Sequence, residues 1–217
     1  MPRVRHTEPV TDPLTAAFYD RPVLEVAVDL LGATVTHGEV TVRLTEVEAY
    51  AGVGDPGSHA FRGQTPRTAV MFGPPGGLYV YFTYGMHWCA NVVCGPQGQA
   101  SAVLLRAGEV VAGELAARAR RGMACPPRDL ARGPARLASA LGLSRDQNGL
   151  RTTDPGCPVQ VRGAAEPVDP ARLRTGARVG VSGPGGDGTA YPWRFWVDGE
   201  ATVSPYRPGK PRRSVRA

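Results

Sequence analysis

Residues 40–50 read VTVRLTEVEAY, a run in which apolar and polar side chains alternate. This period of two residues predicts a β-strand, the second arm of a hairpin that turns at residues 37–39. The even positions of the strand are apolar up to Leu44 and then carry Glu46 and Glu48. We therefore expect one face of this strand to change from apolar to acidic along its length.

The acidic end of this strand has two interpretations. Carboxylates are rarely left in apolar surroundings unless they are paired with a cation or used in chemistry. Glu46 and Glu48 can point into solvent at the end of the strand, and spacing alone favours this interpretation. Alternatively, one of them lies with Tyr50 in a partly shielded pocket and acts as a general base, because a carboxylate there has a tuned pKa and still reaches a water molecule.

The composition is that of one globular domain. The chain has 217 residues, of which 42% are hydrophobic and 20% are charged, and its 28 glycines and 21 prolines predict many turns. Helical and strand patterns are segregated rather than strictly alternating, which favours an α+β fold over a doubly wound one. We expect a flexible N-terminus at residues 1–12, a single domain at 13–204 and a basic, flexible tail at 205–217.

Local signals place the individual elements. Asp12 and Pro13 predict the start of a first helix, and Thr65 predicts the cap of a short one. Further helices are expected in residues 21–32, 110–122 and 133–143. Besides the hairpin, strands are expected as a pair in residues 74–93 that turns at 84–86, and singly in 100–110, 159–163, 177–183 and 193–199.

The charge indicates the class of partner. The sequence carries a formal net charge of +6 and has a pI of about 9.5, and Lys210 is its only lysine. Arginine binds phosphate as a planar fork, so a basic domain of this kind favours an anionic partner such as nucleic acid. A general replacement of lysine by arginine in a GC-rich genome explains the same composition, and charge alone does not separate the two.

The sequence gives no sign of a metal, a cofactor or a membrane segment. Its four cysteines, at positions 89, 94, 125 and 157, form no C-x-x-C pair, and its histidines are scattered, so no zinc site is expected. The sequence shows neither a signal peptide nor an apolar run of 18 residues. We expect an intracellular, cytoplasmic and soluble protein that acts as a monomer.

The second predicted hairpin is rich in tyrosine. Tyr79 is expected to pack in the core, as aromatic residues in strands usually do. Tyr84 and Met86 flank Gly85 at the predicted tip, where apolar side chains are unfavourable unless they insert into a partner. In a basic protein, an apolar wedge between the base steps of nucleic acid fits this arrangement.

Three polar residues in other stretches are further candidates. His59 follows the first hairpin in a long predicted loop, GSHAFRGQTPRT, and a loop histidine beside solvated arginines is its simplest interpretation. Arg106 closes the apolar run SAVLLR, so its guanidinium is expected to have a specific partner. Asn91 lies within the apolar run CANVV, where its amide is expected at least to satisfy backbone groups.

Together these stretches resemble the alkyladenine (3-methyladenine) DNA glycosylases of the mammalian type. The resemblance extends from about residue 18 to residue 204. It rests on EVEAY with a histidine nine residues after the tyrosine, RGQTPR, MFGPPGGLYVYFTYGMHWCANVV, AVLLRA, GPARLASALG, ARVGVSG and WRFWV. It implies a single mixed domain with a curved antiparallel sheet, surrounding helices and a protruding β-hairpin.

The resemblance also implies roles for individual residues. Glu48 activates the attacking water and Arg106 helps to position it. The base pocket is formed by rings that stack on the flipped base and by an amide that screens its edge against normal purines; the residues are Tyr50, His59, Tyr81 and Asn91. Tyr84 fills the gap left in the duplex, with Met86 beside it. Glu46, two residues deeper, is expected to form a structural pair, for instance with an arginine.

The implied activity is that of a base-excision repair glycosylase. It flips alkylated or deaminated purines (3-methyladenine and 7-methylguanine, with hypoxanthine and ethenoadenine as further candidates) out of duplex DNA and hydrolyses the N-glycosidic bond. Without a lysine in the body of the chain, a strand-cutting lyase step is not expected. A non-catalytic DNA-binding module and a hydrolase of free nucleosides are the alternatives, disfavoured by Glu48 with Arg106 and by the predicted hairpin wedge, respectively.

Overall fold

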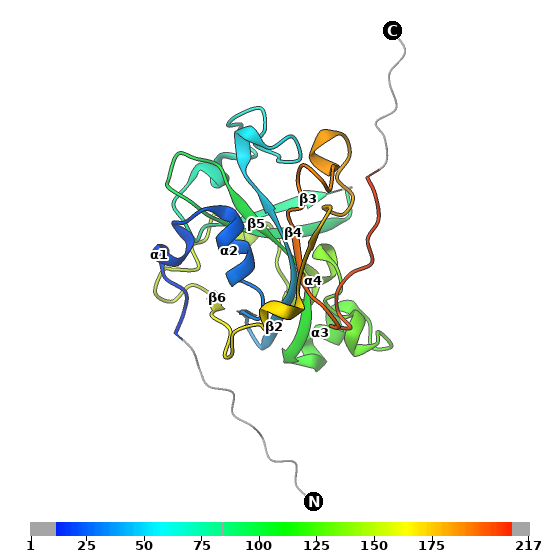
Figure 1. Ribbon diagram of the computed structural model, residues 1–217. Coiled ribbons are helices and arrows are strands. Elements are labelled where there is room, and N and C mark those ends of the chain that lie inside the picture. The colour runs from blue at the N-terminus through cyan, green and yellow to red at the C-terminus, as the bar shows by residue number, and fades with distance from the viewer. Residues whose placement is uncertain (1–11, 84, 210–217) are drawn as a thin grey trace, which may run out of the picture.

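The computed structural model describes residues 12–83 and 85–209 of the chain (Figure 1). Residues 1–11, Tyr84 and the end of the predicted tail, residues 210–217, lie outside this part. Within it, the helices are α1 (Ala16–Tyr19), α2 (Val23–Asp29), α3 (Glu114–Arg121) and α4 (Pro134–Leu141). The strands are β1 (Thr34–His37), β2 (Val40–Tyr50), β3 (Leu78–Thr83), β4 (His87–Val93), β5 (Ala102–Ala112), β6 (Val159–Arg162), β7 (Leu173–Gly176) and β8 (Arg194–Val197).

Strand β2 is the centre of one antiparallel sheet. The strand order is β3-β4-β5-β2-β1-β6, and β8 pairs with both β2 and β7. One edge of β2 is covered by β5, while the other is shared by β1, opposite residues 40–43, and β8, opposite residues 46–48. The predicted α+β domain with a curved antiparallel sheet is confirmed, and the β3–β4 hairpin forms one edge of this sheet.

The ladder between β2 and β5 is interrupted on either side of Glu46. The register shifts there twice, passing over Thr45 in β2 and Arg106 in β5. Such β-bulges bend a strand and redirect its side chains, and they occur often beside functional sites.

This irregularity changes which face of β2 meets the core. The even positions up to Leu44 belong to the main hydrophobic core, but from Val47 on the odd positions belong to it. The prediction that Glu46, Glu48 and Tyr50 continue the apolar face is therefore wrong, because the bulge turns them to the opposite face of the sheet. The solvated strand end is wrong as well, since Glu46 and Glu48 have no exposed surface.

The two faces of the sheet carry separate apolar clusters. The main core is formed by the sheet with α2 and α4, and α4 packs against β4 and β5. A smaller cluster on the other face joins the ends of β3, β4 and β5 to the long segment after β2; it consists of Ala60, Met71, Tyr79, Val93, Ala100 and Ala102. Residues 51–77 thus form a wall over the face that carries the acids. In the described residues no helix is long and apolar enough to span a membrane.

Three predicted elements differ in the structure. The first helix begins after Thr15 rather than at Asp12, because residues 13 and 14 extend the edge of β6, with the Leu14 N–H donating to the Val161 carbonyl at 2.9 Å. The short helix expected at Thr65 is a 3₁₀ turn over Ala69–Phe72.

Residues 177–183, predicted as a strand, form a loop instead. Gly180 and Gly183 have φ angles of +74° and +71°, which are incompatible with a strand. The strand lies just before, as β7, where it pairs with β8.

Gly108 allows the close approach of β2 and β5 beside the bulge. A Cβ atom there would lie 2.3 Å from the Arg43 carbonyl oxygen and 2.5 Å from a methyl group of Val42. We expect Gly108→Ala to lower the free energy of unfolding by about 1–3 kcal/mol, because backbone has to move. Urea denaturation measures this; Gly54→Ala, at a site with nothing within 4 Å, is the matched control. Equal stability of the two variants would contradict the tight contact.

Candidate active site

Four residues from four adjacent strands form a row across the face of the sheet opposite the main core. Tyr79 pairs directly with Asn91, Asn91 with Leu104, and Leu104 with Glu48. All four line one cavity of about 1270 Å³. Besides the sheet, two loops contribute most of its lining, through residues 56–59, 61–62 and 179–184. The sequence-predicted residues Glu48, Tyr50, His59, Tyr81, Asn91 and Arg106 all line this cavity.

The carboxylate of Glu48 lies at the bottom of this cavity. Its Oε2 accepts a hydrogen bond from the Tyr50 hydroxyl at 2.9 Å, and its Oε1 accepts one from the Val179 backbone N–H at 2.7 Å. Nη1 of Arg106 lies 3.5 Å from Oε1. Burial raises the pKa of Glu48 above its ordinary value of 4.5, although Arg106, the Val179 amide and the Tyr50 hydroxyl act in the opposite direction.

Glu46 has a different environment from Glu48. Its carboxylate accepts hydrogen bonds from Nε of Arg106 at 2.8 Å and Nε of Arg194 at 2.7 Å, and from the hydroxyl and backbone N–H of Ser204 at 3.0 and 2.7 Å. The predicted pairing of Glu46 with an arginine is confirmed. Arg106 also has the specific partner that its place in the sequence predicted, and it bridges the two acids.

An aromatic group forms the wall beside the carboxylate. Tyr79 and Tyr81 stack with ring centroids 5.3 Å apart, and the His59 ring meets Tyr81 edge-on at 4.6 Å. The Tyr79 hydroxyl lies 3.1 Å from Nδ1 of His59. Partial burial and the charge of Arg67 lower the pKa of His59 below its ordinary value of 6.5, which favours the neutral imidazole.

Asn91 and the hairpin tip complete the predicted set. The buried Asn91 donates from Nδ2 to the Tyr79 carbonyl at 3.0 Å, so it satisfies a backbone group and lines the cavity at once. Met86, between strands β3 and β4, is 69% exposed, whereas Tyr84 lies outside the described residues. The structure thus brings the pocket residues together and leaves Met86 free to contact a partner.

Sequence reasoning missed three parts of the site. The Val179 amide is a backbone donor that no side-chain pattern reveals. The sequence indicates Leu104 only as part of the strand expected in residues 100–110, and Tyr79 only as a core residue. Tyr79 is indeed buried, but it also lines the cavity and contacts His59. Its position two residues before Tyr81, on the same strand face, was the signal available for it.

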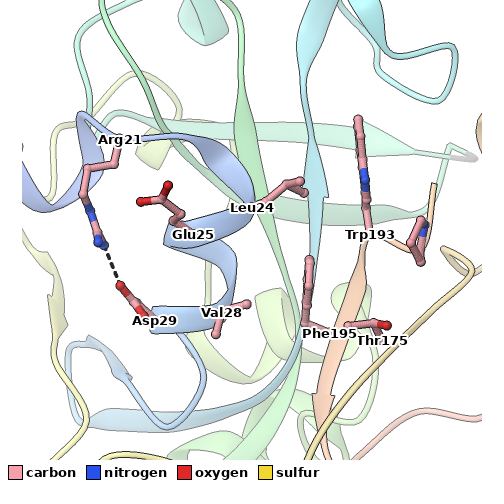
Figure 2. A pocket seen from close by; sticks show the side chains of 9 residues that line it. Arg21, Leu24, Glu25, Val28, Asp29, Thr175, Trp193 and Phe195 are labelled. Carbon is pink, nitrogen blue, oxygen red and sulfur yellow. Dashed lines mark ion pairs between the residues drawn. The ribbon is translucent and has the colours of Figure 1, made fainter. Parts of the chain in front are cut away.

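A second cavity, of about 630 Å³, lies between α2 and the β7–β8 pair (Figure 2). It is lined on one side by Leu24 and Val28 and on the other by Trp193 and Phe195, and none of the residues predicted for the site takes part. Asp29 there is paired with Arg21 at 2.9 Å. The larger cavity, which holds a buried carboxylate beside stacked rings, is therefore the candidate active site.

Comparison with known proteins identifies the family. The family model for methylpurine-DNA glycosylase matches residues 17–201, most of the chain. The chain belongs to the methylpurine-DNA glycosylase family. It is accordingly an enzyme, a DNA glycosylase, and the resemblance stated from its motifs is confirmed at the level of the family.

Similar proteins come from bacteria. A protein of Streptomyces avermitilis is 55% identical over 210 residues, which cover 94% of this chain and 97% of the relative. One of Frankia casuarinae is 58% identical over 207 residues, covering 90% and 93% of the two chains. Each bears the name "Putative 3-methyladenine DNA glycosylase". The assignment of this glycosylase to the mammalian type stays a prediction.

The glycosylase depends on Glu46 for the stability of this site. Glu46→Gln leaves Arg106 and Arg194 buried without their shared charge partner, so we expect the free energy of unfolding to fall by about 3–5 kcal/mol. Chemical denaturation measures the change. Glu114→Gln, which breaks an exposed pair with Arg118, is the control and is expected to change stability by less than about 1 kcal/mol. Similar losses in both variants would argue against a structural role for Glu46.

Proposed function

We propose that this glycosylase removes alkylated purines, 3-methyladenine and 7-methylguanine first, from duplex DNA by hydrolysis of the N-glycosidic bond. The observation that carries the proposal is the buried Glu48 carboxylate beside the ring group of Tyr50, His59 and Tyr81, in one cavity. A base in a duplex is out of reach of such a cavity, so the nucleotide has to be flipped out, at an energy of a few kcal/mol.

The ring group offsets the energy of base flipping. Stacking on an aromatic side chain contributes about 1–3 kcal/mol per base, which is the size required. A purine methylated at N3 or N7 is cationic, so the electron-rich faces of these rings attract it further. Asn91 lines the same pocket, and its amide would disfavour normal purines by its contact with the edge of the base. Hypoxanthine and ethenoadenine, which are neutral, are further candidate substrates.

Glu48 then acts on the attacking water. A carboxylate offers about four acceptor sites, and within the described residues Glu48 accepts two hydrogen bonds, from Tyr50 and Val179. A water molecule can occupy one of the remaining sites. Glu48 takes the proton of this water and stabilises the positive charge that develops on the sugar, while Arg106 holds the carboxylate and the water in place.

The remaining parts of the proposal concern DNA. Tyr84, two residues before the exposed Met86 in the sequence, would enter the gap left by the flipped nucleotide, and Met86 would contact the DNA beside it. The net charge of +6 favours binding of the phosphate backbone, which would weaken steeply as salt rises. The chain would act as a monomer near the chromosome in the cytoplasm. Without a lysine in the described residues to form a Schiff base, the product would be an abasic site in an uncut strand.

The first test replaces the proposed general base, the Glu48 carboxylate, by an amide of nearly the same shape. Glu48→Gln is expected to keep binding to duplex DNA with one 7-methylguanine and to slow release of the free base by about 10²–10⁴-fold, the usual contribution of a general base. Single-turnover kinetics measure release, and titration of the same duplex measures binding. Glu114→Gln is the control for both. Unchanged release by Glu48→Gln would remove Glu48 from its role, and equal activity on the free nucleoside would favour a nucleoside hydrolase.

The second test uses the raised pKa of Glu48. Because only the ionised carboxylate takes a proton, the rate of release falls as pH drops through this pKa. A raised pKa moves this loss to higher pH, so we expect the midpoint above pH 4.5, the ordinary glutamate value. A cationic base such as 7-methylguanine is the suitable substrate, because its departure needs no added proton. A midpoint at or below 4.5 would contradict the buried environment of Glu48.

A further inference from the structure

Behind the cavity lies a second buried ion pair that the proposed mechanism does not use. Arg178 and Asp55 both have no exposed surface. Nη1 and Nη2 of Arg178 donate to the two carboxylate oxygens of Asp55 at 2.5 and 2.6 Å. Because two buried charges lose their hydration, such a pair is weak evidence for stability, and another role has to be considered.

All five N–H groups of Arg178 have acceptors. Besides Asp55, Nη1 donates to the Ala49 carbonyl at 3.0 Å, Nη2 to the Gly185 carbonyl at 2.7 Å, and Nε to the same carbonyl at 3.3 Å. Asp55 in turn accepts the backbone N–H groups of Ala51 and Gly57 at 3.2 and 2.8 Å. The pair therefore connects the end of β2, the loop 51–59 and the loop 177–186.

These two loops lie side by side above the sheet (Figure 1, cyan and orange). They meet closely at Gly185, where a Cβ atom would lie 2.2 Å from the backbone N of Gly57. The guanidinium of Arg178 lies over the ring of Tyr50, 4.6 Å from its centroid, with Tyr191 and Trp193 at 5.5 and 5.4 Å. Aromatic rings thus enclose the ion pair.

The consequence for the active site follows from the next residue in the chain. Val179 comes directly after Arg178, and its N–H is one of the two hydrogen-bond donors to Glu48. The other donor is Tyr50, whose ring lies against the guanidinium of Arg178. Arg178 thus borders both donors to Glu48, although neither it nor Asp55 has surface with which to touch a substrate.

We propose that the Asp55–Arg178 pair is a positioning device that fixes the Val179 amide and the Tyr50 hydroxyl on the Glu48 carboxylate. This inference rests on the proposed function of Glu48. The guanidinium fork is required because it reaches two oxygens of Asp55 and two backbone carbonyls at once, which a single ammonium group cannot do.

The test keeps the charge and removes the fork. In Arg178→Lys the Val179 amide is released from Glu48, so the carboxylate loses a donor that favours its ionised form. The acid limb is the low-pH part of the pH profile of single-turnover base release, where the rate falls as Glu48 is protonated. We expect this limb to move to higher pH. The maximal rate should fall by about 10- to 100-fold, as for misplaced catalytic groups. Because the net charge is unchanged, the shift reports the lost hydrogen bond. The titratable and charged groups around Glu48 that Arg178 does not hold, and that stay in place, are Glu46, Tyr81, Cys89 and Arg106. The Tyr50 hydroxyl is expected to loosen together with the Val179 amide.

Two further variants keep the test decisive. Asp55→Glu also keeps the charge but lengthens the side chain, and it should shift the limb in the same direction if Arg178→Lys does not fold. Val161→Ala, which removes buried volume from β6 at the far end of the sheet, is the control and should leave the limb in place. A lower rate with an unmoved limb in both Asp55→Glu and Arg178→Lys would overturn the proposal.

A measurement without DNA separates this inference from the proposed function. In the free wild-type protein, the NMR shift of the Val179 amide proton should titrate with Glu48, and in Arg178→Lys this titration should disappear. Persistence of the titration in the variant would overturn the positioning role even if Glu48 proves catalytic. Conversely, full activity of Glu48→Gln would contradict the proposed function of Glu48. It would not affect the NMR evidence for the Val179–Glu48 hydrogen bond in the wild-type protein.

Discussion

The structure depends on the compensation of three carboxylates that have no exposed surface: Glu46, Glu48 and Asp55. A buried carboxylate is strongly unfavourable unless donors replace its lost hydration. Each acid joins segments that are distant in the sequence, because its donors come from different parts of the chain. Glu46 joins β2, β5, β8 and the segment at Ser204, while Asp55 joins the two loops above the sheet. The arrangement around the cavity follows from these requirements.

The three carboxylates do not accept the same number of hydrogen bonds, and this number distinguishes a structural acid from one that can bind water. Within the described residues, Glu46 and Asp55 each accept four hydrogen bonds, which is about the capacity of a carboxylate. Glu48 accepts two, with Arg106 at the looser distance of 3.5 Å. A fully satisfied acid has no site left for water, and this difference supports the role proposed for Glu48. Motif spacing does not separate Glu46 from Glu48, whereas donor number does.

Much of the sheet could be predicted from the sequence, because alternation in residues 40–50 and the turn at 37–39 are local signals. The face of Glu48 could not, since it depends on register shifts at Thr45 and Arg106 that arise between two distant strands. Gly108 is a partial signal, because glycine inside a strand pattern often marks such an irregularity. Residues 177–183 resemble a strand in the sequence but form a loop, because their contacts with Asp55 and Glu48 are long-range and leave no local pattern.

The bulge also explains how the glycosylase combines a buried acid with a stable domain. If β2 kept its alternation, Glu48 would face the main core, where α2 and α4 leave no room for a substrate. The register shifts instead place the apolar side chains of Val47 and Ala49 in the main core and Glu48 in the lining of the cavity. One face of the sheet is therefore densely packed against the helices, and the other face forms an open pocket that contains polar and charged groups. The two register shifts beside Glu46 are sufficient for this division, since they set the face on which every later residue of β2 lies.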